Sequence, residues 1–436
     1  MVWVGIDDTD APTGGCTTWA MTEVVRIARA HGLDPIGAPR LVRLNPNVPW
    51  KTRGNAALAA RFGHGVGRAT VIGSIDGQPV RAYRRGRPPS GPARRAFVAE
   101  IWGRLRALAP RARGTDPALV VTDRAPPARL YWGAVRGVVG VGENAARLDR
   151  FGAETHHRGG RRGLIGAAAA IAWPARWSTW ELIAYRPAAD WGTPRRVDAA
   201  SVRRAQRAQP GLFLCHDPRT RRVLVAPHTP CPILFGLRGR TVAAVRGARP
   251  IVRGGRVDRW IVFRTNQGSG DHLRERPPDG IRPFESGIVH GTIVAVPGAR
   301  AGGHVTFDLE DSAGRRANCV AFEPTKVLPR VAAALVPGDR VTVWGSRGRG
   351  PTLRLEGIRV DRLVPRIRAR KPRCRRCDRV ARSLGRARGF RCTTCHRRWP
   401  PEAATTARRS TPLRERTAYH PTASARRHLA PLAPER

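Results

Sequence analysis

The chain has 436 residues, 41% of them hydrophobic, which at roughly 100–200 residues per domain predicts two to four domains with packed cores. Its 79 basic and 32 acidic residues give a net charge of +47. Such a charge favours a polyanionic partner, most simply nucleic acid. Genomic base composition is an alternative explanation of the arginine excess. The sequence has no run of about 18 apolar residues and no signal pattern, so we expect a cytoplasmic protein without a membrane partner.

The amino-terminal stretch places three carboxylates between a predicted strand and a predicted helix. Apolar residues 2–6 indicate a buried strand, and Asp7, Asp8 and Asp10 follow it closely. Apolar residues at helical spacing begin after Thr17 and Thr18. Open α/β sheets bind ligands at the carboxyl ends of their strands, so this stretch is a candidate ligand site. Its carboxylates suit Mg²⁺, and the amino terminus of the helix favours an anion. The alternative is a polar turn whose threonines only cap the helix.

A loop rich in Asn, Pro and Gly follows at Leu41–Asn55 and carries Lys51, Arg53 and Asn55. These groups would hold nucleotide phosphates if the loop lies near the acidic turn; an ordinary surface loop is the alternative. Beyond it, the patterns predict an α/β layer with strands at Ala69–Ile75 and Ala118–Thr122, helices at Pro92–Leu108 and Leu130–Val141, and a solvated basic loop at Arg81–Arg95.

A glycine- and arginine-rich loop precedes an alanine-rich helix between His156 and Ala170. Glycine lets backbone N–H groups approach a phosphate, and the amino end of the helix favours negative charge. The stretch lacks a Walker A ending and the spacing of a dinucleotide fingerprint, so an ordinary loop is again the alternative. The predicted phosphate cradle is Arg158–Gly163, with Arg158, Gly159, Gly160, Arg161 and Gly163 as binding residues.

The middle of the chain predicts a strand at Trp180–Pro187, a basic helix at Arg195–Gln209, and a strand with a polar turn at Ile261–His272. A cysteine and histidine cluster lies between the last two. Its spacing lacks a paired C-x-x-C or H-x-x-x-H, so buried cysteines are favoured over a zinc site. The cluster comprises Cys215, His216, Asp217, His228 and Cys231.

From Gly287 the sequence becomes all-β. Five strands with one helix between the third and fourth is the order of an OB-fold, which commonly binds single-stranded nucleic acid. A barrel without a ligand is the alternative. The strands are predicted at Ile288–Val296, His304–Asp311, Arg316–Phe322, Arg340–Gly345 and Thr352–Val360, and the helix at Val327–Leu335.

Two C-x-x-C pairs, separated by fourteen residues, make the strongest local motif. Four thiolates paired in this way indicate a structural Zn²⁺ site in a zinc ribbon, and a closed shell of four leaves no catalytic position. The residues are Cys374, Cys377, Cys392 and Cys395. The arginine-rich tail after Pro401 is predicted to become ordered only on RNA.

These stretches together resemble the archaeal isoleucine-tRNA 2-agmatinylcytidine synthetases. The resemblance is carried by G-I-D-D-T-D, C-T-T, N-P-N-V-P-W-K-T-R-G-N, H-R-G-G-R-R-G-L-I-G-A, W-E-L-I-A-Y-R, T-N-Q-G-S-G-D-H-L, G-G-H-V-T-F-D-L-E-D, the four paired cysteines and Y-H-P-T-A-S-A-R-R-H-L. It implies an α/β multidomain protein: a kinase-like ATP-binding domain at 1–60 and 130–197, a ferredoxin-like domain at 61–129 and 198–280, an OB-fold β-barrel at 281–365, and a zinc ribbon with the tail at 366–436.

The resemblance also implies a reaction. The family uses ATP and agmatine to replace the oxygen at position 2 of the wobble cytosine in an isoleucine tRNA with a CAU anticodon, which then reads AUA. By the same resemblance, Asp7, Asp8 and Asp10 would hold Mg²⁺ or align the attacking group, Thr17 or Thr18 would be phosphorylated, and Lys51, Arg53 and Arg158–Gly163 would bind phosphates.

One departure and two alternatives remain. Cys231 stands where an acidic residue is expected in this family, which leaves any role at that position in doubt. A non-catalytic tRNA-binding protein with a degenerate nucleotide site is the first alternative, and the intact acidic cluster beside C-T-T argues against it. The second is a nucleic-acid kinase or ligase that needs no agmatine.

Overall fold

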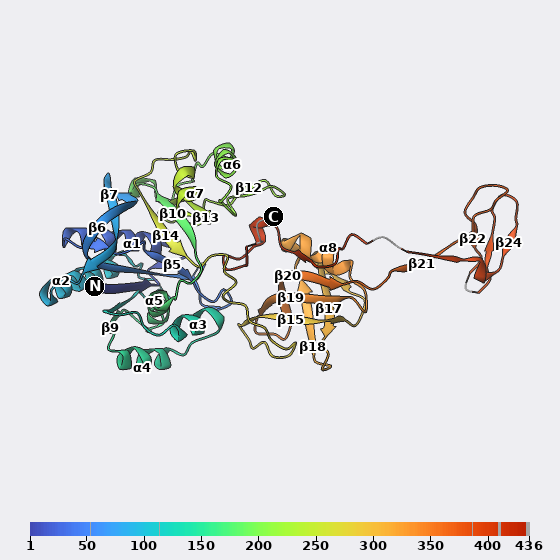
Figure 1. Ribbon diagram of the computed structural model, residues 1–436, viewed down its shortest axis with the longest axis horizontal. Coiled ribbons are helices and arrows are strands. Elements are labelled where there is room, and N and C mark those ends of the chain that lie inside the picture. Colours follow the sequence, from blue (N-terminus) through green and yellow to red (C-terminus); the bar gives the residue numbers. More distant parts are fainter. Residues whose placement is uncertain (53, 113, 386, 409–410, 433–436) are drawn as a thin grey trace.

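The structure is a computed structural model that describes residues 1–52, 54–112, 114–385, 387–408 and 411–432. It has a large α/β body that contains the amino terminus, a β-barrel beside it, and a small body at the end of an extended arm (Figure 1). Among the predicted site residues, Arg53 lies outside the described residues. Within the described part of the chain, no helix is both long and apolar enough to cross a membrane.

A ten-stranded sheet organises the large body. Its strand β1 (Val2–Asp7) is antiparallel to both neighbours, β6 (Ala56–Ile75) and β8 (Ala118–Thr122). The only parallel pairing in the described part of this sheet joins β5 (Arg40–Arg43) to β14 (Arg259–Thr265). The acidic stretch follows a strand, as predicted, and this strand pairs antiparallel on both sides. The remaining strands are β4 (Asp34–Pro35), β7 (Gln78–Arg87), β9 (Glu154–His157), β10 (Thr179–Tyr185) and β13 (Ile233–Gly239).

The side chains of β1 alternate between two apolar cores, one on each face of the sheet, and helices pack on both faces. Val2, Val4 and Ile6 join a core that includes residues of α1 (Thr17–Ala30) and α2 (Gly91–Leu108). The opposite core includes α3 (Arg129–Arg136), α4 (Val141–Phe151) and α5 (Gly163–Ala172).

Gly5 allows α5 to lie directly on β1. A Cβ atom at Gly5 would lie 2.3 Å from the carbonyl oxygen of Ala167, a distance that no side chain tolerates. Near the start of α5, a Cβ atom at Gly166 would lie 1.7 Å from Oδ2 of Asp7. The two glycines therefore bring the amino end of α5 to the carboxyl end of β1.

A second set of elements extends the sheet at its β13 edge. The helices α6 (Ala199–Ala208) and α7 (Val242–Ala248) pack with β10, β13 and β14 around a separate apolar core. The short pair β11 (His216–Asp217) and β12 (Arg222–Val223) lies in the connection before β13. Cys215 and Cys231 are each 1% exposed, so the prediction of buried cysteines in this region is confirmed.

The barrel has the predicted five strands. They pair in the order β15-β19-β20-β18-β17, and an additional pairing of β15 with β17 closes the barrel. The helix α8 (Val327–Ala333) lies between β18 and β19, the third and fourth barrel strands in chain order, as predicted. The strands are β15 (Ser286–Ile293), β17 (His304–Glu310), β18 (Arg316–Ala321), β19 (Arg340–Arg347) and β20 (Leu353–Arg362), with β16 (Gly298–Arg300) as a short addition.

The small body is joined to the barrel through an antiparallel pair of strands, β21 (Ile367–Arg370) and β25 (Thr405–Arg408). Its own sheet consists of β22 (Arg382–Ser383), β23 (Phe390–Arg391) and β24 (Arg398–Trp399). The chain then returns to the barrel, where β26 (Thr417–Tyr419) pairs with β20.

Four predicted elements need correction. The basic run at Arg81–Arg95 is not one loop, because β7 continues to Arg87 and α2 begins at Gly91. The predicted helix at Leu130–Val141 ends earlier, with Gly137 as the cap residue of α3. The first residues of the predicted loop Leu41–Asn55 belong to β5. The tail at 411–432 is packed against the barrel and the large body without RNA, so the prediction of order only on RNA is wrong for these residues.

Candidate active site

The acidic stretch forms a tight, strained turn at the end of β1. Asp7 is the last residue of β1, and its Oδ1 accepts a hydrogen bond of 2.7 Å from the N–H of Asp8. Asp8 has a φ of +56°, a left-handed conformation that is uncommon outside glycine and that asparagine and aspartate adopt more readily than most residues. The turn places the Asp7 carboxylate against Gly166, near the start of α5.

Asp10 connects this turn to the start of α1. The short hairpin of β2 (Asp10–Ala11) and β3 (Gly14–Gly15) returns the chain so that Thr17 and Thr18 are the first two residues of the helix. The Thr17 hydroxyl donates to Asp10 Oδ1 at 3.5 Å. A phosphate on either threonine would therefore lie at the positive end of the helix dipole, beside the carboxylates.

Asp116 is a member of this site that the sequence did not indicate. It lies two residues before β8 and is 8% exposed. Its backbone N–H donates to Asp8 Oδ2 at 2.9 Å, and its own Oδ2 accepts a 2.6 Å hydrogen bond from the N–H of Arg162. Its buried Oδ1 has no hydrogen-bond partner among the described residues. Asp116 thus links the acidic turn to the glycine-rich loop.

Burial and the neighbouring carboxylates disfavour the charged forms of Asp7 and Asp8. Burial raises the pKa of Asp7 well above its usual range, and the charge of Asp8 raises it further. Burial also raises the pKa of Asp8 to about 6, partly offset by the hydrogen bond from Asp116. A bound cation would relieve both costs because it neutralises the buried negative charge.

The glycine-rich loop between β9 and α5 approaches the same turn. Gly159 has a φ of +104° and lies so close to Asp116 that a Cβ atom would be 3.2 Å from its Oδ1. Arg158 points elsewhere and anchors the loop, since its guanidinium donates to the carbonyl oxygens of Arg106, Ala109 and Pro110. Arg162 instead stacks over the ring of Trp50, with its Cζ atom 4.2 Å from the ring centroid.

The loop that carries Lys51 lies beside the glycine-rich loop, because its Trp50 contacts Arg162. Lys51 donates to the carbonyl oxygen of Pro46, and burial lowers its pKa. Asn55 holds the base of this loop through a 2.7 Å hydrogen bond from its Nδ2 to the carbonyl oxygen of Asn45. Trp50, at the tip, remains 45% exposed.

These segments enclose one cavity of about 780 Å³. Its volume lies within the range of roughly 300–1,000 Å³ that is typical of small-molecule sites. The far wall is formed by residues of β10 and β13 and by His428 of the tail. Arg158 and Arg161 are not among the lining residues. The predicted site residues that do line the cavity are Asp7, Asp8, Asp10, Thr17, Thr18, Lys51, Gly159, Gly160 and Gly163.

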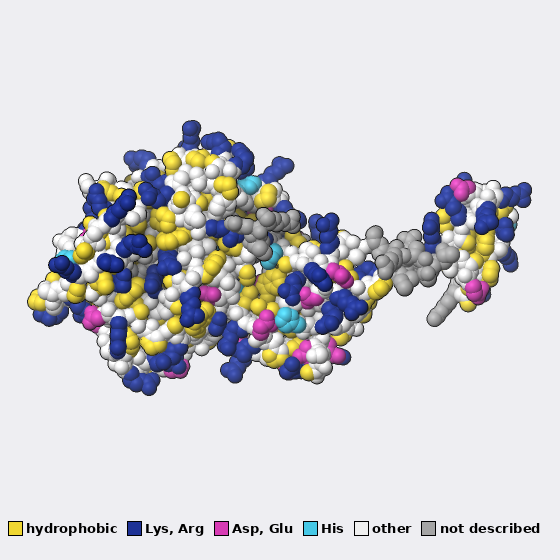
Figure 2. Space-filling model, in the orientation of Figure 1, with side chains coloured by type: hydrophobic (Ala, Val, Ile, Leu, Met, Phe, Trp, Pro, Cys, Tyr) yellow, Lys and Arg dark blue, Asp and Glu magenta, His cyan; other side chains and the backbone are white. Residues whose placement is uncertain are grey.

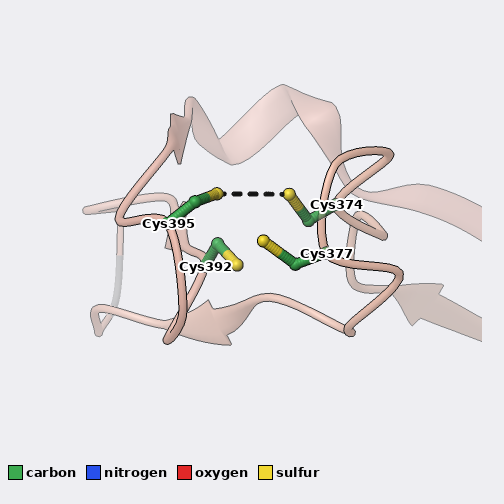
Figure 3. Close-up of side chains that lie close together, drawn as sticks. All are labelled: Cys374, Cys377, Cys392 and Cys395. Carbon is green, nitrogen blue, oxygen red and sulfur yellow. Dashed lines mark hydrogen bonds between the residues drawn. The ribbon is translucent and has the colours of Figure 1, made fainter.

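The paired cysteines form a second, separate site. The four Sγ atoms all lie within 4.8 Å of one another, and those of Cys374 and Cys395 are 3.4 Å apart (Figure 3). Tetrahedral zinc with Zn–S bonds of about 2.3 Å places sulfur atoms roughly 3.8 Å apart, which these thiols match. Among the described residues, this is the only group of three or more Cys, His, Asp or Glu side chains with donor atoms so close together.

Comparisons with known proteins agree on one family. The model of the TiaS TCKD domain matches residues 3–160, and that of the TiaS FLD domain matches residues 161–272. The isoleucine-tRNA 2-agmatinylcytidine synthetase TiaS of Methanopyrus kandleri is 34% identical over 446 residues, which covers 99% of this chain and 96% of that protein.

Two solved structures extend the similarity to complexes. The chain is similar to TiaS bound to its isoleucine tRNA and ATP, with a TM-score of 0.83 and 30% identity over 98% of this chain and 96% of that chain. It is also similar to TiaS bound to the same tRNA, AMPCPP and agmatine, with a TM-score of 0.80 and 28% identity over 99% of this chain and 96% of that chain.

Proposed function

Because this chain belongs to the isoleucine-tRNA 2-agmatinylcytidine synthetase family, we propose that it joins agmatine to a cytidine of an isoleucine tRNA in an ATP-dependent reaction. The observation that supports this most strongly is the single cavity in which the acidic turn, the Thr17-Thr18 pair and the glycine-rich loop meet. A degenerate, non-catalytic nucleotide site would not be expected to retain all three.

The chemistry requires the oxygen at position 2 of the cytosine to become a leaving group. Transfer of a phosphoryl group from ATP to that oxygen achieves this. The amine nitrogen then bonds to the C2 carbon, the C2–O bond breaks, and phosphate and a proton leave. Positioned cations and backbone N–H groups are the usual electrostatic supports for phosphoryl transfer.

The residues of the cavity fit these steps. Gly159, Gly160 and Gly163, at the amino end of α5, would receive the phosphates of ATP, with Arg162 and Lys51 as cationic contacts. Asp7, Asp8, Asp10 and Asp116 would hold Mg²⁺, for which a few carboxylates together with substrate phosphates are sufficient ligands. The raised pKa values of Asp7 and Asp8 support a cation there. Arg53 stays a proposed phosphate contact. The predicted phosphate contacts of Arg158 and Arg161 are not retained, because the Arg158 guanidinium donates to backbone carbonyl oxygens and neither residue lines the cavity.

We propose that the bodies carry the modules expected from the resemblance. The closed barrel, whose strands span 286–362, would be an OB-fold within the predicted range of 281–365. The four thiols would hold a structural Zn²⁺ in a ribbon within 366–436. The large body would combine a kinase-like module (1–60 and 130–197) with a ferredoxin-like one (61–129 and 198–280), which share the ten-stranded sheet.

ATP turnover tests the proposed function. Turnover should depend on both the isoleucine tRNA and agmatine, because the leaving group forms on the tRNA and the amine completes the exchange. Turnover with tRNA alone at the full rate would favour a nucleic-acid kinase. Absence of turnover, with tRNA binding intact, would favour the non-catalytic alternative.

Incubation with ATP and Mg²⁺ is expected to place a phosphate on the Thr17-Thr18 pair. Thr17 is favoured because its hydroxyl already donates to Asp10. The helix dipole would stabilise the product by about 0.3–1 kcal/mol. Peptide mass spectrometry locates the phosphate, and the double variant Thr17→Ala/Thr18→Ala is the control. An unmodified peptide, with full activity in the double variant, would end this assignment.

Binding of tRNA is expected to weaken steeply with salt. Lys and Arg side chains are spread over the visible face of all three bodies (Figure 2), and each phosphate that they neutralise releases counterions. Between about 50 and 200 mM salt we expect a loss of affinity of at least about tenfold, measured by filter binding. An affinity that hardly changes would assign the arginine excess to genomic composition.

A further inference from the structure

The described part of the tail, residues 411–432, packs against the large body with its last residues. After β26, the N–H groups of Gly268 and Gly270 donate to the carbonyl oxygens of His428 and Leu429, each at 2.8 Å. Leu429 is 1% exposed and belongs to the apolar core that includes α3 and α5. The tail is therefore part of the large body, and it places His428 in the wall of the active-site cavity.

Three side chains form a hydrogen-bonded row, in which Glu181 and His428 line the cavity and Gln267 lies between them. Gln267 donates from Nε2 to Oε2 of Glu181, and its Oε1 lies 2.9 Å from Nδ1 of His428. Glu181 also lies beside two guanidinium groups, 3.7 Å from Arg43 and 3.5 Å from Arg238. Because the amide nitrogen of Gln267 donates to Glu181, its amide oxygen faces the imidazole.

This arrangement determines the tautomer of His428. The Gln267 oxygen can only accept, so Nδ1 carries the hydrogen and a neutral ring has its lone pair on Nε2. The charge of Arg43, followed by burial, holds the pKa of His428 well below its usual range, so the ring is neutral. The Nε2 edge lies toward the Lys51 loop, since a Cβ atom at Gly54 would be 3.6 Å from Nε2.

We propose that His428 is a substrate-contacting residue, whose Nε2 accepts a hydrogen bond from an N–H group of the amine or of the cytosine. Near it, the cavity is lined by Arg43, Arg238 and Lys51, and by the carboxylate of Glu181, which already accepts a hydrogen bond from Gln267. The cations cannot accept a hydrogen bond, so the neutral imidazole fixed among them is suited to orient an N–H donor. This inference rests on the proposed function, and it makes the tail a component of the active site.

Two isosteric variants of the full-length enzyme separate the roles of the two ring nitrogens. In His428→Asn, the amide nitrogen replaces Nδ1 and keeps the bond to Gln267, but the acceptor at Nε2 is lost. In His428→Gln, the amide oxygen replaces Nε2 as an acceptor. We expect His428→Asn to lower kcat/KM for tRNA modification at least tenfold, and His428→Gln to recover a substantial part of it. A rise confined to the KM for agmatine identifies the amine as the donor, and one confined to the KM for tRNA identifies the cytosine.

The control is Ser424→Ala, which changes the tail but keeps the backbone N–H that donates to Asp217 Oδ2 at 2.9 Å. It should modify tRNA within twofold of the wild type, and all three variants should keep the wild-type thermal midpoint and ATP-dependent threonine phosphorylation. Wild-type modification in His428→Asn would overturn the proposal, as would an inactive His428→Gln beside an active His428→Asn. A wild-type enzyme without agmatine-dependent modification would instead refute the proposed function.

Discussion

Replacement of Asp8 by asparagine is expected to abolish tRNA modification while leaving tRNA affinity nearly unchanged. Asp8 is one of the proposed metal ligands, and its Oδ2 accepts a hydrogen bond of 2.9 Å from the N–H of Asp116. Asparagine keeps the size and the left-handed backbone of this position but removes the charge that a cation requires. We expect modification to fall by at least about a thousandfold, because loss of one transition-state electrostatic contact costs roughly 10²–10³ and here the metal would be lost as well.

The same variant is expected to be more stable than the wild type at neutral pH. Burial raises the pKa of Asp8 from 3.8 to about 6, so the folded state binds more protons than the unfolded state between these values. Stability therefore falls as pH rises from about 4 to 6, and the full cost of the buried charge is present at pH 7. Removal of that charge should add about 1–3 kcal/mol to the free energy of unfolding when no cation is bound.

Modification assays and thermal unfolding at pH 5 and pH 8 check both effects. The control is Asp149→Asn, which makes the same change at an exposed position of α4 and should alter neither activity nor stability. The account predicts a stability gain for Asp8→Asn that is larger at pH 8 than at pH 5. An active Asp8→Asn enzyme, or one that is destabilised at pH 8, would contradict the role assigned to this carboxylate.

Replacement of Cys392 by serine should release zinc from the small body and remove most of the affinity for tRNA. The four Sγ atoms are already within 4.8 Å of one another, and backbone hydrogen bonds from Cys395 and Thr394 lower the pKa of Cys392 to about 6, which favours the thiolate. Structural zinc contributes about 10–16 kcal/mol in small zinc domains, so its loss should unfold this body. Because the small body lies at the end of an arm, its unfolding should leave the large body intact (Figure 1).

Metal analysis of the purified protein should find one zinc per chain in the wild type and none in Cys392→Ser. Threonine phosphorylation by ATP should persist in the variant because the cavity lies in the large body. The control is Thr393→Ala, an exposed neighbour of the same cysteine, which should keep both the zinc and the tRNA affinity. Zinc retained in Cys392→Ser at full stoichiometry would count against the site.

Local patterns predicted much of the fold. Apolar residues at helical spacing located α1 and α2, and short alternating strands between glycine turns located the barrel with its single helix. Partners distant in the sequence were not predictable. The antiparallel neighbours of β1 and the continuation of β7 to Arg87 depend on pairing with the long strand β6, and a basic, glycine-containing strand has the composition of a loop.

The site residues likewise divide into those that a local sequence pattern predicted and those that depend on contacts between distant parts of the chain. The sequence indicated residues in recognisable runs, namely the acidic turn, the Thr17-Thr18 pair and the glycine-rich loop, and the structure brings these into one cavity. It did not indicate Asp116 or His428, because each is a single residue whose role arises only from tertiary contacts. Asp116 matters through its bonds to Asp8 and Arg162, and His428 through the return of the tail. Arg158 was predicted from its position in the loop, but its guanidinium is taken up by backbone carbonyls.

Nucleoside mass spectrometry of the isoleucine tRNA after incubation with the enzyme, ATP, Mg²⁺ and isotope-labelled agmatine tests the central claim most directly. We expect one cytidine per tRNA to acquire the label, and omission of ATP or the Asp8→Asn substitution to prevent labelling. Unlabelled tRNA in the complete reaction, from an enzyme that binds tRNA and carries its zinc, would contradict the account.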